Sequence, residues 1–150
     1  MKTDVIVEPK NICKNESFFR YQYFVFERPI CLPAENQILQ LAYKEQVKVA
    51  VSALSVVNTI YVAKKYGKSN NDVKASLSSL TKHIDIIDLK GKNVVDMLED
   101  DWNDYEDGLQ FVSAENYKSD FIITRNKKDF SQSSIIVLSP QEFIDMVEDD

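Results

Sequence analysis

Short β-branched runs alternate with helical patterns over most of this chain. Alternating strands and helices are typical of a parallel sheet with helices on both of its faces. The sequence therefore predicts a three-layer α/β/α domain with a mainly parallel central sheet. The predicted strands cover 4–8, 47–51, 84–89, 120–124 and 135–138. Two predicted helices begin at Pro33 and directly after Ser52, and four more cover 70–83, 92–100, 104–118 and 139–146.

An aromatic segment at 18–26 is open to two interpretations. Alternation at Phe19, Tyr21 and Tyr23 favours a strand, and the absence of a turn residue before Pro29 also allows a buried helix. Aromatic side chains dominate protein cores, which favours a core role. The alternative is a platform on which RNA bases stack.

Length and composition predict one globular domain over residues 1–150. A chain of this length with 44% apolar residues can bury a core. The sequence has no run of 18 apolar residues that would predict a membrane span, and its first residues do not resemble a signal peptide. We therefore expect a cytoplasmic protein without membrane contact, in which Cys13 and Cys31 are free thiols.

The charge balance and the single histidine exclude several kinds of function. A net charge of −6 argues against non-specific binding of duplex nucleic acid, which requires a basic surface. His83 alone cannot supply a zinc site that needs two or three imidazoles. The sequence also lacks the glycine-rich phosphate-binding patterns of dinucleotide and nucleoside triphosphate sites. Clustered carboxylates that bind metal would themselves make the chain acidic.

Six acidic residues lie within positions 99–107, without one basic residue. Asp104 and Asp107 are three residues apart, so on a helix they would share a face. Oxygen ligands of this kind suit Mg²⁺ or Mn²⁺. The alternative is a solvated first turn whose acids interact favourably with the helix dipole.

A polar turn follows the predicted strand at 120–124, which is where ligands bind in parallel sheets. Thr124 and Asn126 offer short oxygen groups, Arg125 can bind a phosphate, and Asp129 follows three residues later. A plain turn with a helix cap explains the same residues. Glu8, Ser52 and Asn58 follow the earlier predicted strands, at or just beyond their ends.

Taken together, three segments resemble the C-terminal half of a PIN domain. They are Asp104-Tyr-Glu-Asp107, Thr124-Arg-Asn-Lys-Lys-Asp-Phe130 and Val137-Leu-Ser-Pro-Gln-Glu-Phe143. The closer resemblance is to bacterial toxin nucleases of the VapC type. The segment Ser52-Ala-Leu-Ser-Val-Val-Asn-Thr-Ile-Tyr61 also resembles that group, and the match spans about residues 30–146.

The resemblance implies a metal-dependent endoribonuclease that hydrolyses RNA phosphodiester bonds with Mg²⁺ or Mn²⁺, as the toxin of a toxin–antitoxin pair. On the matching positions, Asp107 and Asp129 would bind the metal and Asp104 would support them. Thr124 and Asn126 would orient water or the acids. Arg125 would face the substrate phosphate or be solvated, and Asn58 stands where many PIN domains carry an acid. The implied partners are RNA, a cognate antitoxin and a second copy of the chain.

The first part of the chain departs from the family pattern. PIN domains open with a strand that ends in an Asp-Thr-Asn motif, and residues 1–28 contain none. Glu8 could replace that acid, with Asp4 as a weaker substitute. The alternative hypothesis is a catalytically inactive PIN fold that binds protein or RNA. A third, an α/β signalling domain of the receiver type, would need an acid pair at the end of the first strand.

Overall fold

The computed structural model describes residues 5–7 and 33–149 of the chain. Within these residues the predicted strands and helices are confirmed, with ends that shift by a few residues. In chain order the elements are β1 (Val5–Val7), α1 (Pro33–Tyr43), β2 (Val49–Ser52), α2 (Ala53–Lys65), α3 (Asn70–Leu80), β3 (Ile84–Ile87), α4 (Gly91–Leu98), α5 (Tyr105–Asn116), β4 (Phe121–Ile123), the 3₁₀ helix η1 (Lys127–Phe130), β5 (Ile136–Leu138) and α6 (Pro140–Glu148). The aromatic segment 18–26 lies outside the described residues.

Several helix ends follow directly from the local sequence. Ser52 is the N-cap of α2, and its side chain accepts a hydrogen bond from the Ser55 amide at 3.1 Å. Gly67 follows α2 with a φ of 81°, a left-handed conformation that glycine adopts without strain. At α6, Ser139 and Glu142 form a reciprocal capping box. No helix in the described part of the chain is long and apolar enough to cross a membrane.

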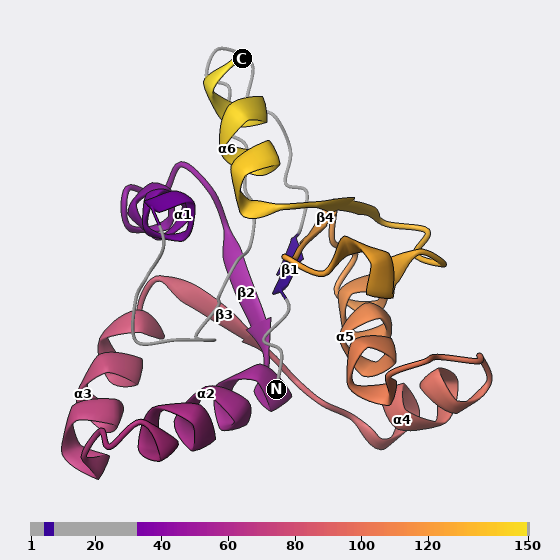
Figure 1. Cartoon of the computed structure of the whole chain (residues 1–150), viewed down its shortest axis with the longest axis horizontal. Helices are drawn as coiled ribbons and strands as arrows, with labels where there is room; N and C mark the ends of the chain where they lie inside the picture. The colour runs from indigo at the N-terminus through magenta and orange to yellow at the C-terminus, as the bar shows by residue number, and fades with distance from the viewer. Residues whose placement is uncertain (1–4, 8–32, 150) are drawn as a thin grey trace.

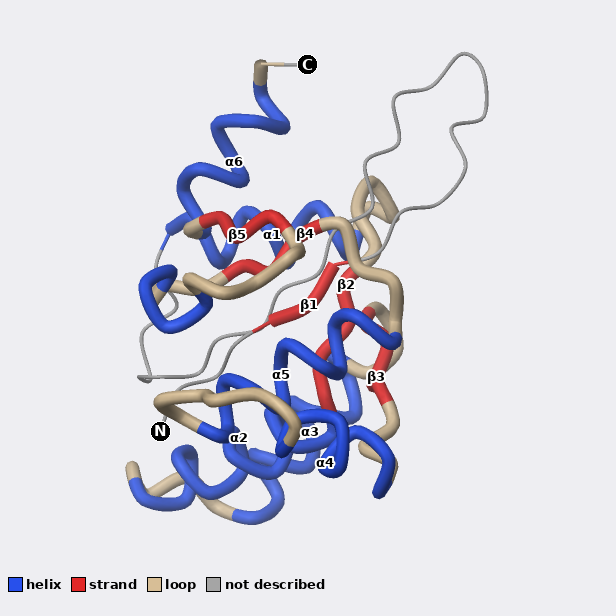
Figure 2. The backbone as a smooth tube through the Cα atoms, turned by 90° about the vertical axis from the view of Figure 1, so that its right-hand side faces the viewer, coloured by secondary structure: helices blue, strands red, loops and turns tan. Residues whose placement is uncertain are grey.

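The five described strands form one sheet in the order β3-β2-β1-β4-β5. β2 pairs with β3 in parallel, and β4 pairs with β5 in parallel. β1 lies between the two pairs (Figure 2). It is antiparallel to both of its neighbours. Four strands therefore point the same way, which is the mainly parallel sheet that the sequence predicts.

The direction of β1 changes the expectation that the carboxyl end of the first strand lies at the same edge as the other site residues. Its last residue, Val7, pairs with Val49 at the start of β2, whereas Val5 pairs with Ile123 at the end of β4. The carboxyl end of β1 thus lies at the opposite edge from the carboxyl ends of the other strands. An apolar run identifies a strand but carries no information on its direction, so the sequence could not show this. Glu8 and Asp4, the proposed replacements for the missing acid, lie outside the described residues.

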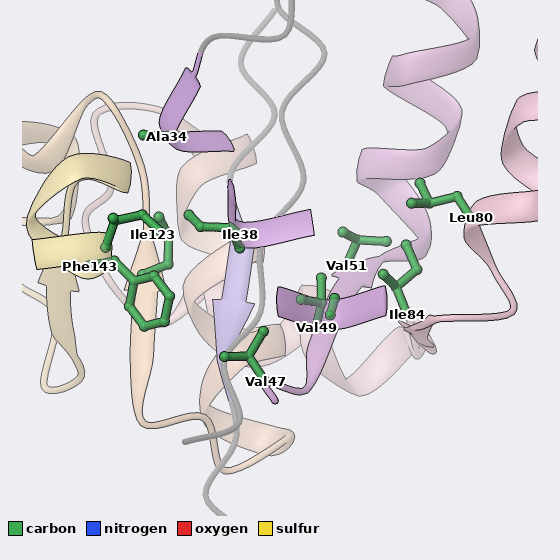
Figure 3. Packing of buried hydrophobic residues seen from close by; sticks show 11 residues of the cluster. Ala34, Ile38, Val47, Val49, Val51, Leu80, Ile84, Ile123 and Phe143 are labelled. Atoms are coloured by element: carbon green, nitrogen blue, oxygen red, sulfur yellow. The ribbon is translucent and has the colours of Figure 1, made fainter. Parts of the chain in front are cut away.

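The sheet separates two hydrophobic cores because alternate strand residues face opposite sides. Val49, Val51 and Ile123 face the first core, which α1, α3 and α6 cover (Figure 3). Phe143 of α6 and Ile38 of α1 are fully buried there. In Figure 1, α1 and α3 lie to the left of β2 and β3, and α4 and α5 lie to the right.

The second core lies between the sheet and the pair α4 and α5. Its buried strand residues are Ala50, Ile87 and Ile122. The buried ring of Trp102 contacts Phe111 of α5 and Phe130 of η1, with ring centroids 5.3 and 6.4 Å away. Trp102 therefore connects α5 to η1. The two cores on opposite faces of one sheet confirm the three-layer α/β/α fold class.

Candidate functional site

Two buried polar residues mark the carboxyl edge of the sheet. Ser52 ends β2, and Thr124 follows β4. The Thr124 amide donates to the carbonyl of Leu138 at 2.9 Å, and its Oγ1 accepts from the Asn126 amide at 3.0 Å. Thr124 thereby fixes the turn that leads from β4 into η1, and its predicted role in orienting water or the acids stays a prediction.

Helices α2 and α5 meet at this edge through two pairs of polar side chains. Asn58 Nδ2 donates to Glu106 Oε1 at 2.6 Å, and Gln110 Nε2 donates to Ser55 Oγ at 2.8 Å. The partners run in opposite order along the two helices, so α2 and α5 are antiparallel at this contact. Asn58 therefore lies beside the acidic start of α5.

Asp107, the strongest predicted ligand, is buried in the first turn of α5 with a relative exposure of 1%. It stands between Glu106 and Gln110, the two residues that bind α2. Burial of a carboxylate is costly unless other groups stabilise its charge. The N-terminus of α5 supplies a favourable dipole at this position. Asp107 is therefore a buried acid whose charge the start of α5 favours.

Asp104 has a different environment from Asp107. It is the N-cap of α5, lies outside the helical turn, and is exposed. Its Oδ1 accepts a hydrogen bond from the Glu106 amide at 2.8 Å. Asp104 is therefore the N-cap of α5 and Asp107 its third residue. Asp104 acts here as a cap, which was the alternative interpretation of the acidic segment.

Asp129 lies in η1, which contacts α5, and Asn126 is the N-cap of η1. Asn126 precedes the helix, and its carbonyl accepts from the Asp129 amide at 2.9 Å. Asp129 is half-buried, and the next residue, Phe130, packs in the core against Trp102. The aromatic contacts of Trp102 thus set how η1, and with it Asp129, lies against the helix that carries Asp107.

Arg125 forms an ion pair with Glu35 of α1. Its Nε donates to Glu35 Oε1 at 2.8 Å, and its Nη2 bonds to the same oxygen. The Glu35 side chain is only 5% exposed, whereas that of Arg125 is 31% exposed. Arg125 is therefore neither a purely solvated side chain nor a residue directed at the Asp107 region. Its predicted contact with substrate phosphate stays a prediction.

The donor chemistry of this edge fits a hard divalent cation. Asp107 and Asp129 offer carboxylate oxygens, and Gln110 Oε1 is a buried acceptor one turn beyond Asp107. Gln110 Oε1 accepts no hydrogen bond from the residues that the structure describes, a state that costs about 1–3 kcal/mol unless a donor or cation is nearby. Residues 5–7 and 33–149 nevertheless contain no group of three His, Cys, Asp or Glu placed to hold a metal ion.

Sequence reasoning missed three polar residues of this edge and the partner of Arg125. They are Ser55, Glu106, Gln110 and Glu35. Ser55 and Gln110 had a recognisable pattern, because Ser52, Ser55 and Asn58, and likewise Asp107, Gln110 and Ser113, recur every three residues at buried positions. Glu106 belongs to neither series. Glu35 had none, since its partner is 90 residues away in the chain.

Comparison with known families agrees with this fold. A family model described as PIN domain (PIN_3) matches residues 21–128. The chain therefore belongs to the PIN-domain family. PIN domains are in general nucleases that use divalent metal ions. No curated protein sequence matches the chain at a significant level.

Proposed function

We propose that this protein is a metal-dependent endoribonuclease that hydrolyses RNA phosphodiester bonds. The observation that carries the proposal is the buried Asp107 carboxylate at the carboxyl edge of the sheet in a PIN domain. Neighbouring polar contacts between α2 and α5 hold that residue in place. A charge in such a position has a cost in stability, which a catalytic role would explain.

Asp107 and Asp129 would hold Mg²⁺ or Mn²⁺, with support from Asp104. Mg²⁺ in proteins is commonly bound by one or two carboxylates together with water and substrate phosphates. When bound, the metal lowers the pKa of a water molecule and stabilises the leaving oxygen. Thr124 and Asn126 orient the turn beside Asp129, and Asn58 positions Glu106. The proposed site does not use the Glu8 carboxylate, because β1, which Glu8 follows in the sequence, ends at the opposite edge of the sheet.

The resemblance to VapC-type nucleases extends the proposal to a biological role. The protein would be the toxin of a bacterial toxin–antitoxin pair in the cytoplasm, with RNA as substrate and a cognate antitoxin as inhibitor. The segments that support this role are the acidic start of α5 and the Thr124-to-Phe130 turn. Both are described by the structure and both border the same edge of the sheet.

Cleavage of a mixed RNA pool in the presence of Mn²⁺ tests the activity. Wild type should cleave, and Asp107→Asn should reduce the rate at least about a hundredfold if Asp107 contacts the metal. Asp101→Asn is the matched control, because Asp101 is an exposed acid of the same segment and should cleave like wild type. Equal cleavage by wild type and Asp107→Asn would overturn the assignment of Asp107.

The alternative function is an inactive PIN fold that acts by binding protein or RNA. It is favoured by one observation, that the described residues contain no three-acid group for a metal. Calorimetric titration with Mn²⁺ separates the two functions. Binding by wild type that Asp107→Asn abolishes supports the nuclease, and no heat of binding in either protein supports the inactive fold.

A further inference from the structure

We propose that a hollow lined by β3, the start of α4 and the end of α5 is a binding site for a nucleoside phosphate. The proposal does not rest on the nuclease activity, because Tyr117 at this hollow is ten residues from Asp107, about 15 Å along α5. The hollow measures about 430 Å³, within the range of about 300–1,000 Å³ that small-ligand pockets have. In Figure 1 the chain passes from β3 to α4, which packs beside α5.

The start of α4 carries no side-chain oxygen that would occupy its free amides. The first amides of a helix have no partner inside the helix, and an oxygen at the N-cap or an acid in the first turn commonly satisfies them. The N-cap of α4 is Lys90, whose side chain has no acceptor atom, and the first turn has no acid. A Cβ at Gly91, the next residue, would meet no atom within 4 Å, so the backbone is accessible. An electropositive and accessible helix start suits a phosphate.

The side chain of Asn93 indicates a ligand independently of the helix start. Asn93 is only 4% exposed and lines the hollow. Its Oδ1 accepts a hydrogen bond from the Lys90 amide at 3.0 Å, which fixes how the side-chain amide is turned. Its Nδ2 donates to no residue that the structure describes. A buried donor without an acceptor destabilises the protein, and a phosphate oxygen in the hollow would supply the acceptor.

Two lysines add positive charge to the same end of the hollow. Lys90 and Lys92 both line it, at a helix end whose dipole does not favour a cation. Lys92 forms an ion pair with Asp96 at 2.6 Å. Lys90 forms no ion pair within the described part of the chain. Lys90 is therefore the cation that is available to a phosphate, beside the free amides of α4 and the Asn93 donor.

The rest of the hollow favours a nucleoside as the group that carries the phosphate. Ile86 and Tyr117 supply an aliphatic and an aromatic surface, on which a planar base can pack. The Tyr117 hydroxyl donates to Asp85 Oδ2 at 2.6 Å, and Lys48 Nζ lies 5.2 Å from the ring centroid, so the ring is held in place. Asp88 also lines the hollow. Its carboxylate repels a bare phosphate but accepts hydrogen bonds from the hydroxyl groups of a sugar.

Titration calorimetry of the full chain with adenosine 5′-monophosphate tests the site. A chelator is present throughout, so that metal-dependent cleavage plays no part. We expect the nucleotide to bind at least about tenfold more tightly than adenosine or inorganic phosphate, because only the nucleotide makes both sets of contacts. An RNA trinucleotide with a 5′-phosphate distinguishes the sources of the ligand: tighter binding than the mononucleotide indicates an RNA end, and equal or weaker binding indicates a free nucleotide. Adenosine or inorganic phosphate that binds as tightly as the nucleotide, or no binding by any probe, would overturn the proposal.

Lys90→Asp tests the location of the site without unfolding the protein. It removes the cation and supplies an N-cap oxygen for the free amides, so affinity for the nucleotide should fall at least about tenfold. The melting temperature should not fall, because aspartate is a favourable N-cap and its charge agrees with the helix dipole. Lys74→Glu is the matched control, since Lys74 is exposed on α3 and the change in charge is the same. Undiminished binding by Lys90→Asp, or an equal loss in Lys74→Glu, would contradict the assignment.

Discussion

Asp104 and Asp107 lie three residues apart and have opposite environments. Asp104 is exposed and caps α5, whereas Asp107 is buried one turn later. An N-cap carboxylate satisfies an amide that the helix leaves free, and this role needs no further function to explain it. Asp107 is buried in the first turn of the same helix, where the helix dipole favours its charge. At the scale of the residue, burial is what distinguishes a candidate ligand from a cap in an acidic segment.

The Arg125–Glu35 pair predicts an asymmetry between single and double variants. Arg125→Met leaves the Glu35 carboxylate buried without its cation and should lower the free energy of unfolding by about 2–4 kcal/mol. Glu35→Leu combined with Arg125→Met should cost less than Arg125→Met alone, because no uncompensated charge is left. Urea denaturation of the three proteins measures both differences. A double variant that is less stable than Arg125→Met would show that the pair itself stabilises the fold.

Glu142 predicts a pH-dependent contribution to stability. Lys127 Nζ donates to both of its carboxylate oxygens and the Ser139 amide to one, and these bonds lower the pKa of Glu142 from its ordinary value. A lowered pKa in the folded state means that the stabilisation is complete above the unfolded pKa of about 4.3 and is lost as the pH falls through the folded value. Glu142→Gln should therefore melt below wild type near neutral pH.

In strong acid the melting temperatures of wild type and Glu142→Gln should converge. Glu148→Gln is the control at the other end of α6, where removal of an acid relieves an unfavourable interaction with the helix dipole and should not destabilise the protein. Thermal melts followed by circular dichroism at several pH values decide this. A melting difference between Glu142→Gln and wild type that is independent of pH would contradict the role of the Lys127 contact.

At the scale of the element, the position of α5 depends on a close contact between Gly108 and Trp102. A Cβ at Gly108 would lie 2.6 Å from Trp102 Cγ, and the ring is held between Phe111 and Phe130. Gly108→Ala should lower the free energy of unfolding by about 1–2 kcal/mol, because the overpacking outweighs the better helix propensity of alanine. It should also reduce any Mn²⁺ affinity, since Phe130 carries Asp129 with it.

Gly91→Ala is the matched control for that prediction. Gly91 also lies in a helix, but its surroundings are open, so alanine should leave stability unchanged or raise it slightly. Chemical denaturation of both variants provides the comparison. Equal effects at the two glycines would mean that Trp102 moves aside without cost and does not fix the distance between α5 and η1.

The helices and strands were predictable because each depends on nearby residues. Ser52 as the cap of α2 and Ser139-Pro140 at the start of α6 are local patterns that the structure confirms. The 3₁₀ helix η1 was predicted only as a turn with a cap, since four residues carry no periodicity. The contacts that build the site were not predictable. Asn58–Glu106 and Glu35–Arg125 join residues far apart in the chain, and local spacing contains no information about them.

At the scale of the whole molecule, the proposed site predicts a link between metal binding and folding. A ligand that binds only the folded state stabilises it by about 2.7 kcal/mol at a hundredfold excess over its dissociation constant. Mn²⁺ should therefore raise the melting temperature of wild type at neutral pH, and a chelator should reverse the change. Asp107→Asn should show no increase, whereas Asp101→Asn should behave like wild type. No increase in wild type would favour the inactive fold.

The central position of β1 has a consequence for the order in which the protein can assemble during synthesis. Ile6 pairs with Ala50 on one side and with Ile122 on the other. The ribosome makes β1 before either partner, and β4 appears only after most of the chain, a wait on the order of ten seconds at about 5–20 residues per second. The two parallel pairs that flank β1 come from separate stretches of the chain, 49–87 and 121–138. The nascent protein must therefore keep one edge of β1 unpaired until β4 emerges, which gives chaperones a defined interval in which to bind it.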